Sequence, residues 1–195
     1  MRRKNFDALV SATGLVVSAV LLAASGLLFW THSFIADNVR TQLVAQRIFI
    51  PEPGSEALND LAVKPYLSKY AGQQLRNGEQ AKAYADHFIA VHLREMTGGQ
   101  TYSELSVQAQ QTPTDTALQQ KIATVFRGET LRGLLLNAYA FGKMGQIAFV
   151  TAWVALGSGL VVLALAVLGV LHARRTSYDV KVHGPGWHPE RMPTS

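Results

Sequence analysis

The sequence predicts an all-α membrane protein in which two transmembrane helices flank a small extracytoplasmic helical bundle. Three observations support this fold class. An uncharged apolar stretch lies near each end of the 195-residue chain, and the segment between them has the mixed composition of a soluble protein. No part of the chain shows the sustained alternation of polar and apolar residues that is typical of a strand.

The first span is predicted at residues 8–30, where no charged side chain occurs. A helix needs roughly 20 apolar residues to cross the ~30 Å hydrocarbon core of a bilayer. Trp30 lies at the end of this run, at the membrane interface where aromatic anchors are common. A signal peptide cleaved near Ala23-Ala24-Ser25 is the alternative, although the apolar run is long for one and continues past that site.

The second span is predicted at residues 144–172, and Arg174 and Arg175 follow it at the membrane interface. This run is longer than a perpendicular span requires, so the helix has to tilt or protrude into the headgroup region. Residues 173–195 are rich in Gly, Pro and polar side chains, and we expect them to form a disordered tail.

The charges that flank the two spans predict the orientation of the chain. Three basic residues lie within residues 1–7, and further basic residues follow the second span. Positively charged flanks remain in the cytoplasm, so we expect both termini there. Residues 31–143 would then form a domain outside the cytoplasm.

Turn-forming residues divide this middle segment into helices. No proline precedes Pro51, so the first span can continue outward as a helix until the turn at Pro51-Glu52-Pro53-Gly54. A second turn is predicted at residues 112–115, and proline-free sequence then leads through residues 127–143 into the second span. We therefore expect a small bundle with the two span extensions as its outer members.

The clearest soluble helix is predicted at residues 79–96. Gly98-Gly99 would end it, and Thr101-Tyr102-Ser103-Glu104 has the spacing of a capping box that opens a short helix. The stripe that would face the core comprises Ala81, Tyr84, Ala85, Phe88, Val91 and His92.

The composition excludes several chemistries. Cysteine is absent, which excludes disulfides, thiolate nucleophiles and cysteine-based metal sites. The net charge of +5 is concentrated beside the spans, so no nucleic-acid partner is expected. The sequence contains neither a G-x-S-x-G elbow nor a glycine-rich phosphate loop. We therefore expect neither an enzyme nor a cofactor.

His87, His92 and Glu95 are the weak candidates for a metal site. A helical histidine pair that binds zinc needs a spacing of four, whereas the spacing of five here turns the two imidazoles apart by roughly 140°. His92 and Glu95 share one face of the helix, but the partner motifs of a di-metal bundle are absent. We expect a core-facing His92 and a solvated His87.

Small residues four apart in the spans are candidates for close helix packing. They are the pairs Gly14 and Ser18, Ala19 and Ala23, and Ala155 and Gly159. Near the predicted membrane surface, Arg127, Arg132 and Lys143 are candidates for contact with lipid headgroups.

Two segments carry a resemblance to a known group of proteins. The runs YAGQQLRNGEQAKAYADHFIAVHL and RGETLRGLLLNAYAFGKMGQIA resemble uncharacterised two-span bacterial membrane proteins, some of which are labelled aromatic ring-opening dioxygenases. The resemblance implies a multi-pass protein of the bacterial cell membrane. Extradiol ring opening requires iron held by two histidines and a carboxylate, and no such set is discernible in the sequence, so the resemblance implies no mechanism.

These observations predict a non-enzymatic assembly or accessory subunit that acts through its extracytoplasmic helical domain. Its expected partners are the lipid bilayer and either another membrane protein or further copies of itself. One alternative is a ligand-sensing module that signals through a partner, and another is a metal-dependent enzyme.

Overall fold

The computed structural model describes residues 3–175, which divide into two compact units. Unit 1 comprises the described parts of Met1–Ala23 and Ala155–Ser195, and unit 2 is Ala24–Val154. All regular elements in this part of the chain are helices, and the extended segments form only an isolated bridge between Phe49 and Gln74. The prediction of an all-α chain is therefore confirmed for the described residues.

Two long helices, α1 (Arg3–Ala45) and α7 (Thr116–Arg175), carry the apolar stretches of the chain. Within them, Ala8–Ala45 and Thr116–His172 are long and apolar enough to cross a membrane. Both helices continue well past the predicted spans without a break, as the sequence predicted from the absence of proline. The expected tail lies outside the described residues, apart from the end of α7.

In unit 1, α1 and α7 run antiparallel and approach closely through small side chains. A Cβ atom placed on Gly14 would lie 3.0 Å from the Cβ of Ala166, so a larger residue there would push the two helices slightly apart. Ser11 and Ser18 are buried on the same side of α1, while the neighbouring large apolar side chains of the helix are exposed.

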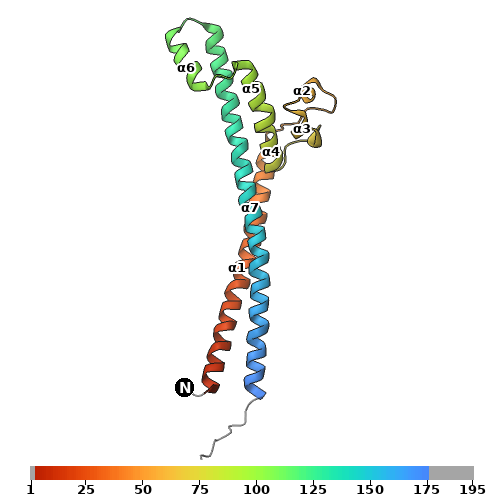
Figure 1. Ribbon diagram of the computed structural model, residues 1–195, viewed down its shortest axis with the longest axis vertical. Coiled ribbons are helices and arrows are strands. Elements are labelled where there is room, and N and C mark those ends of the chain that lie inside the picture. The colour runs from red at the N-terminus through yellow and green to blue at the C-terminus, as the bar shows by residue number, and fades with distance from the viewer. Residues whose placement is uncertain (1–2, 176–195) are drawn as a thin grey trace, which may run out of the picture. The chain divides into compact units, whose positions relative to one another are not determined.

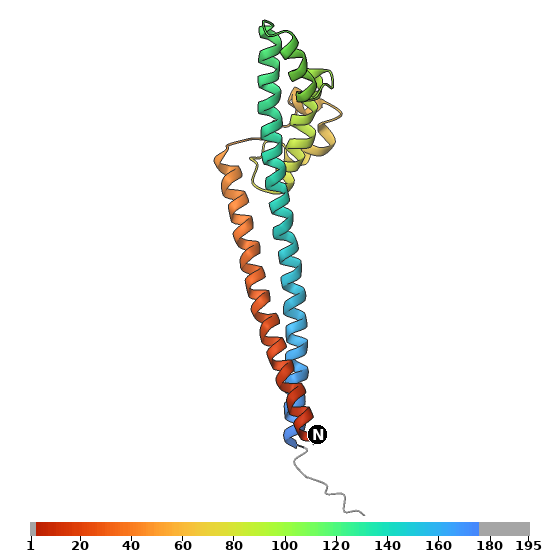
Figure 2. The ribbon, with the colours of Figure 1, turned by 90° about the vertical axis from the view of Figure 1, so that its left-hand side faces the viewer.

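Unit 2 contains all the shorter helices. A continuous helical stretch formed by α4 (Gly78–Tyr84), η2 (Ala85–Ile89) and α5 (Ala90–Thr97) lies alongside α7 (Figures 1 and 2). The remaining elements are α2 (Glu56–Asn59), α3 (Lys64–Leu67), η1 (Ser68–Tyr70) and α6 (Tyr102–Gln111). Their apolar core comprises Val39, Leu43, Ile50, Leu58, Val63, Leu67, Leu75, Ala81, Ala85, Ile89, Val91, Leu93 and Leu135.

The predicted helix 79–96 is interrupted by a π-turn at η2, where the Ala90 N–H donates to the Ala85 carbonyl five residues back. Five of the buried residues along this stretch follow a spacing of four: Ala81, Ala85, Ile89, Leu93 and Thr97. In a regular α-helix each such step would drift by about 40° around the axis. The wider π-turn absorbs part of this drift and keeps Leu93 and Thr97 on the buried side.

The turns that bound this stretch follow the sequence predictions. Gly98 ends α5 in the left-handed conformation, with φ 65°. At the start of α6, the Thr101 hydroxyl accepts from the Glu104 N–H while the Glu104 carboxylate accepts from the Thr101 N–H, which confirms the capping box.

Two extended segments connect α1 to α4 and hold the start of α4 in place. Ile50 N–H donates to the Gln73 carbonyl at 2.9 Å, and Leu75 N–H donates to the Ile48 carbonyl at 2.9 Å. The buried Gln80 side chain accepts from the Arg76 N–H at 2.8 Å and donates to the Gln73 side chain. These bonds fix the segment that carries Arg76 against α4.

Candidate functional site: a charged cleft and an apolar groove

Unit 2 has two concave surfaces that both include side chains of α1 and α7. The first, here called the charged cleft, has a volume of about 640 Å³. The second, here called the apolar groove, has a volume of about 500 Å³. The charged cleft is lined by His32, Ile35, Ala36, Asp37, Val39, Arg40, Tyr70, Arg76, Asn77, Gly78, Glu79, Tyr139, Gly142, Lys143, Gly145 and Gln146. The apolar groove is lined by Phe34, Ile35, Asn38, Val39, Gln42, Leu43, Gln46, Leu134, Asn137, Ala138, Phe141 and Met144.

Three cations line the charged cleft, and they differ in their partners. The Lys143 ammonium contacts the Glu79 carboxylate at 2.6 Å. Arg40 on α1 and Arg76 before α4 are exposed, and neither guanidinium forms an ion pair within residues 3–175. Asp37 lines the same cleft without an ion pair among those residues. The cleft therefore holds two unpaired guanidiniums and one unpaired carboxylate.

A close approach of α4 to α7 forms one wall of the charged cleft. A Cβ atom on Gly78 would lie 2.9 Å from the Tyr139 Cα and 3.1 Å from the Ala138 carbonyl oxygen. The Tyr139 ring lies between two ammonium groups, 5.4 Å from Lys82 and 5.5 Å from Lys143. Such cation–π contacts fix the ring against the wall.

At the other end of the charged cleft, the α1 side is formed by the uncharged residues Ile35 and His32. His32 on α1 lies with its Nδ1 2.9 Å from the Gly145 carbonyl oxygen of α7. Its ring centroid is 4.8 Å from that of Phe149. Along α1 the lining therefore changes from charged at Arg40 and Asp37 to uncharged at His32, about 12 Å from Arg40 at the rise of an α-helix. On α7 the Lys143 ammonium bonds to the Gln146 side chain at 3.0 Å, one residue from Gly145.

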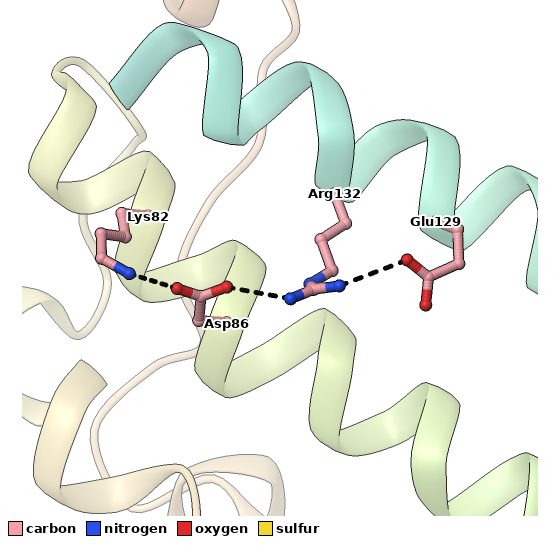
Figure 3. A network of polar contacts seen from close by, with 4 residues as sticks. All are labelled: Lys82, Asp86, Glu129 and Arg132. Carbon is pink, nitrogen blue, oxygen red and sulfur yellow. Dashed lines mark hydrogen bonds and ion pairs between the residues drawn. The ribbon is translucent and has the colours of Figure 1, made fainter. Parts of the chain in front are cut away.

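Beside the charged cleft, an ion-pair network joins the helical stretch α4–η2–α5 to α7 (Figure 3). The Asp86 carboxylate bonds to the Lys82 ammonium and, at 3.3 Å, to the Arg132 guanidinium. Arg132 also contacts Glu129 at 3.4 Å. Burial alone would raise the pKa of Asp86, but the hydrogen bonds and charges of Lys82 and Arg132 outweigh it and lower that pKa.

The apolar groove combines exposed apolar side chains with carboxamides. Phe141 is 54% exposed, and Phe34, Leu134 and Met144 have nearly the same exposed fraction. No charged residue lines the groove, although Asn38, Gln42, Gln46 and Asn137 do. Neutral amides can both donate and accept hydrogen bonds without the cost of burying a charge.

The three weak candidates for a metal site have different surroundings. Burial lowers the pKa of His87, whose ring stacks on that of Tyr66 with centroids 3.4 Å apart. His92 is exposed, and its Nδ1 lies 2.8 Å from the Phe88 carbonyl oxygen. The expectation of a core-facing His92 is therefore wrong, because the π-turn rotates the residues that follow it, whereas His87 is half-buried and keeps part of its surface in solvent. Glu95 is exposed, and residues 3–175 contain no group of three potential ligands.

The small residues predicted to pack between helices fall on two different sides. Gly14 faces Ala166, and Ser18 is 1% exposed, with no hydrogen-bond partner for its hydroxyl among residues 3–175. Gly159 is buried against Leu22, and Ala155 is half-buried. Ala19 and Ala23 are exposed. The structure thus brings the first and third pairs to the α1–α7 contact in unit 1, but not the second.

The residues predicted to contact the membrane surface have different surroundings in the structure. Trp30 is exposed and stacks on Phe34, Lys143 lines the charged cleft, and Arg174 is exposed. Nothing is described of the Arg175 side chain. Arg132 is tied to Asp86 rather than free.

Arg127 is exposed on α7, but its position argues against a headgroup contact. It precedes Met144 by seventeen residues of unbroken helix, or about 25 Å. If the second span begins at Met144, this distance exceeds the headgroup layer of about 5–8 Å.

The fold and these surfaces define a class, an all-helical chain with two apolar helices compatible with a two-span membrane protein. Comparison with known proteins adds no relative, because no family model, no curated protein and no solved structure matches the chain. Of the three cations in the charged cleft, sequence reasoning had selected only Lys143. Arg40, Arg76 and Lys143 come from three distant segments, and no local pattern relates them.

Proposed function

We propose that the protein is a two-span membrane protein that acts as an assembly or accessory subunit. In this proposal the domain between the spans lies outside the cytoplasm and docks a helix of another integral membrane protein. The observation that supports it is the apolar groove, where four large exposed apolar side chains lie together without a charge. Clustered apolar exposure of this kind usually marks an interaction site.

The position of the groove favours a membrane-anchored helix as its occupant. The groove is lined by residues 34–46 and 134–144, directly beside the predicted ends of both spans. A partner that crosses the same bilayer can therefore place a helix against the groove as it leaves the membrane. Its backbone and side chains would find hydrogen-bond partners in the carboxamides of Gln42, Gln46 and Asn137.

Site-specific photocrosslinking in native membranes tests this proposal. A photoreactive phenylalanine analogue is placed at Phe141 in the groove, and the matched control carries it at Phe126. Phe126 is 55% exposed on the same helix but does not line the groove. We expect a discrete adduct from Phe141, and from Leu134, with the same integral membrane protein identified in both. Phe126 should give none.

Three results would contradict the proposal. They are the absence of a discrete adduct at both groove positions, an equal yield of the same adduct from Phe126, or an adduct of twice the chain mass. The last result would replace the accessory role by self-association. Insertion is measured separately: extraction of the chain from membranes by alkaline carbonate would contradict the two-span topology itself.

Ligand sensing is a second candidate, and the charged cleft is the observation that favours it. A ligand there would contact both α1 and α7, because Arg40 and Lys143 lie on different helices. Limited proteolysis of the purified full chain with and without a panel of anionic ligands tests this role. Protection by none of them would count against it. The other alternative, a metal-dependent enzyme, has no supporting geometry among the described residues.

A further inference from the structure

We propose that the charged cleft binds the phosphate-bearing headgroup of a phospholipid, with Arg40 and Arg76 holding the phosphate. The inference rests on the two-span topology proposed above, and it gives the charged cleft a ligand class. It does not depend on the partner proposed for the apolar groove.

The first observation that supports this inference is the net positive charge of the charged cleft. Arg40 and Arg76 approach the cleft from different segments, are exposed, and have no carboxylate partner within residues 3–175. Lys143 is neutralised by Glu79, and Asp37 offsets only one of the two guanidiniums. The cleft therefore keeps a net positive charge. A guanidinium offers a planar fork of donors that matches two phosphate oxygens, so these residue types suit a phosphate ester.

The second observation is that the α1 side of the charged cleft is charged at Arg40 and uncharged at His32. Its cationic end on α1 lies about 12 Å along that helix from His32, which is the lining residue nearest the first predicted span. At the His32 end α1 contributes no charged side chain, and on α7 the Lys143 ammonium is paired with Glu79 and bonded to Gln146 at 3.0 Å. A free phosphate ion would use only the cationic end. A phospholipid would use both, with its glycerol and acyl groups toward the span.

The third observation is the volume of the charged cleft, together with the type of residues that line it. A volume of about 640 Å³ exceeds what a single phosphate ion fills and lies within the range of about 300–1,000 Å³ common for organic ligands. Tyr70 and Tyr139 line the cleft, and tyrosine combines an apolar ring with a polar hydroxyl. Such side chains are enriched at the membrane interface, where headgroups meet hydrocarbon.

Native mass spectrometry of the full chain in mild detergent tests the inference, with phosphatidylglycerol as the probe. The test variant carries Arg40→Gln and Arg76→Gln. The matched control carries Arg94→Gln and Arg127→Gln, which removes the same charge from exposed positions outside the cleft. We expect the apparent Kd for the lipid to rise about tenfold or more in the test variant, as the loss of a charge-assisted hydrogen bond would cause. The control should change less than about twofold.

Each further result supports or overturns the inference. An equal loss in both variants would overturn it, because binding would then reflect net charge alone. Inorganic phosphate that binds as tightly as the lipid and displaces it would assign the cleft to a soluble phosphate compound instead. If the glutamine variant fails to fold, the variant with Arg40→Lys and Arg76→Lys decides. It keeps the charge but loses the planar fork, and unchanged affinity there would overturn the proposed role of the guanidiniums. If the two-span topology is wrong, alkaline carbonate will extract the chain from membranes, and this result is obtained independently of lipid binding.

Discussion

Replacement of glycine by alanine should change the stability in opposite directions at Gly78, which lies against the α7 backbone, and at Gly133, which does not. Gly78→Ala would add a methyl group 2.9 Å from the Tyr139 Cα and 3.1 Å from the Ala138 carbonyl oxygen. Both are backbone atoms of a long helix, so neither can move aside cheaply. Inserting a methyl group into such a site costs about 1–3 kcal/mol. The better helix propensity of alanine returns about 0.5–1 kcal/mol.

The expected net loss of stability for Gly78→Ala is therefore about 0–2.5 kcal/mol. For a chain of this size it corresponds to a decrease in Tm of up to about 10 °C. Gly133→Ala is the matched control, since a Cβ there meets nothing within 4 Å and only the propensity gain remains.

Thermal unfolding of both detergent-solubilised variants, followed by circular dichroism, makes the comparison. We expect Gly78→Ala to melt below the unaltered protein and Gly133→Ala to melt at or above it. A Tm for Gly78→Ala that is raised as much as that for Gly133→Ala would refute the close contact between α4 and α7.

Three further predictions concern other contacts. In this cysteine-free chain, Gly14→Cys with Ala166→Cys should form a disulfide on mild oxidation, because a Cβ at residue 14 would lie 3.0 Å from that of residue 166 and an outward shift of about 0.5 Å brings the pair into the usual range of about 3.5–4.5 Å, whereas Ala19→Cys with Ala166→Cys should not. Maleimide labelling before and after reduction reads this out, and equal yields from the two pairs would contradict the α1–α7 contact in unit 1. Because the folded state lowers the pKa of Asp86, its ion pairs stabilise the fold fully above the unfolded value near 3.8 and lose this effect as pH falls through the lower folded value. The difference in Tm between the unaltered protein and Asp86→Asn should therefore shrink from pH 7 to pH 3, and a constant difference would count against the network. Thr101→Ala should cost about 1 kcal/mol through loss of the cap and speed hydrogen exchange in α6, and unchanged exchange would argue against the capping box.

The features that could be predicted from sequence are those governed by local rules. Proline and glycine set the ends of the helices, as Gly98 does for α5, and the capping box at Thr101 needs only four consecutive residues. The two apolar helices could be predicted from the absence of charge over a long run. Each of these signals lies within one segment of the chain.

The small residues of the helix contacts could be predicted only in part, because a spacing of four does not match the spacing of the buried side chains. The buried serines of α1 are Ser11, Ser18 and Ser25, which are seven apart. A spacing of seven keeps residues on one side of a helix that pairs with another at a small crossing angle. Ala19 is one residue further around the helix from Ser18 and is exposed.

The charged cleft could not be predicted because it depends on pairings between distant segments. Arg76 is held at the cleft by its N–H donation to the Gln80 side chain and by the backbone hydrogen bonds that Ile50 and Leu75 donate. The ion pair between Asp86 and Arg132 joins residues 46 apart and leaves no periodic signal. Such contacts follow from tertiary packing, which sequence periodicity does not report.

The π-turn at η2 has a consequence for the evolution of this protein. Because the wide turn accommodates one extra residue, loss of one residue between Ala85 and Ile89 would convert it into ordinary α-helix and leave Leu93 in its position against Gly128. Homologues without the π-turn should therefore differ by a single-residue gap inside a helix, where gaps are normally treated as alignment errors. The positions equivalent to Leu93 and Thr97 should remain buried in them.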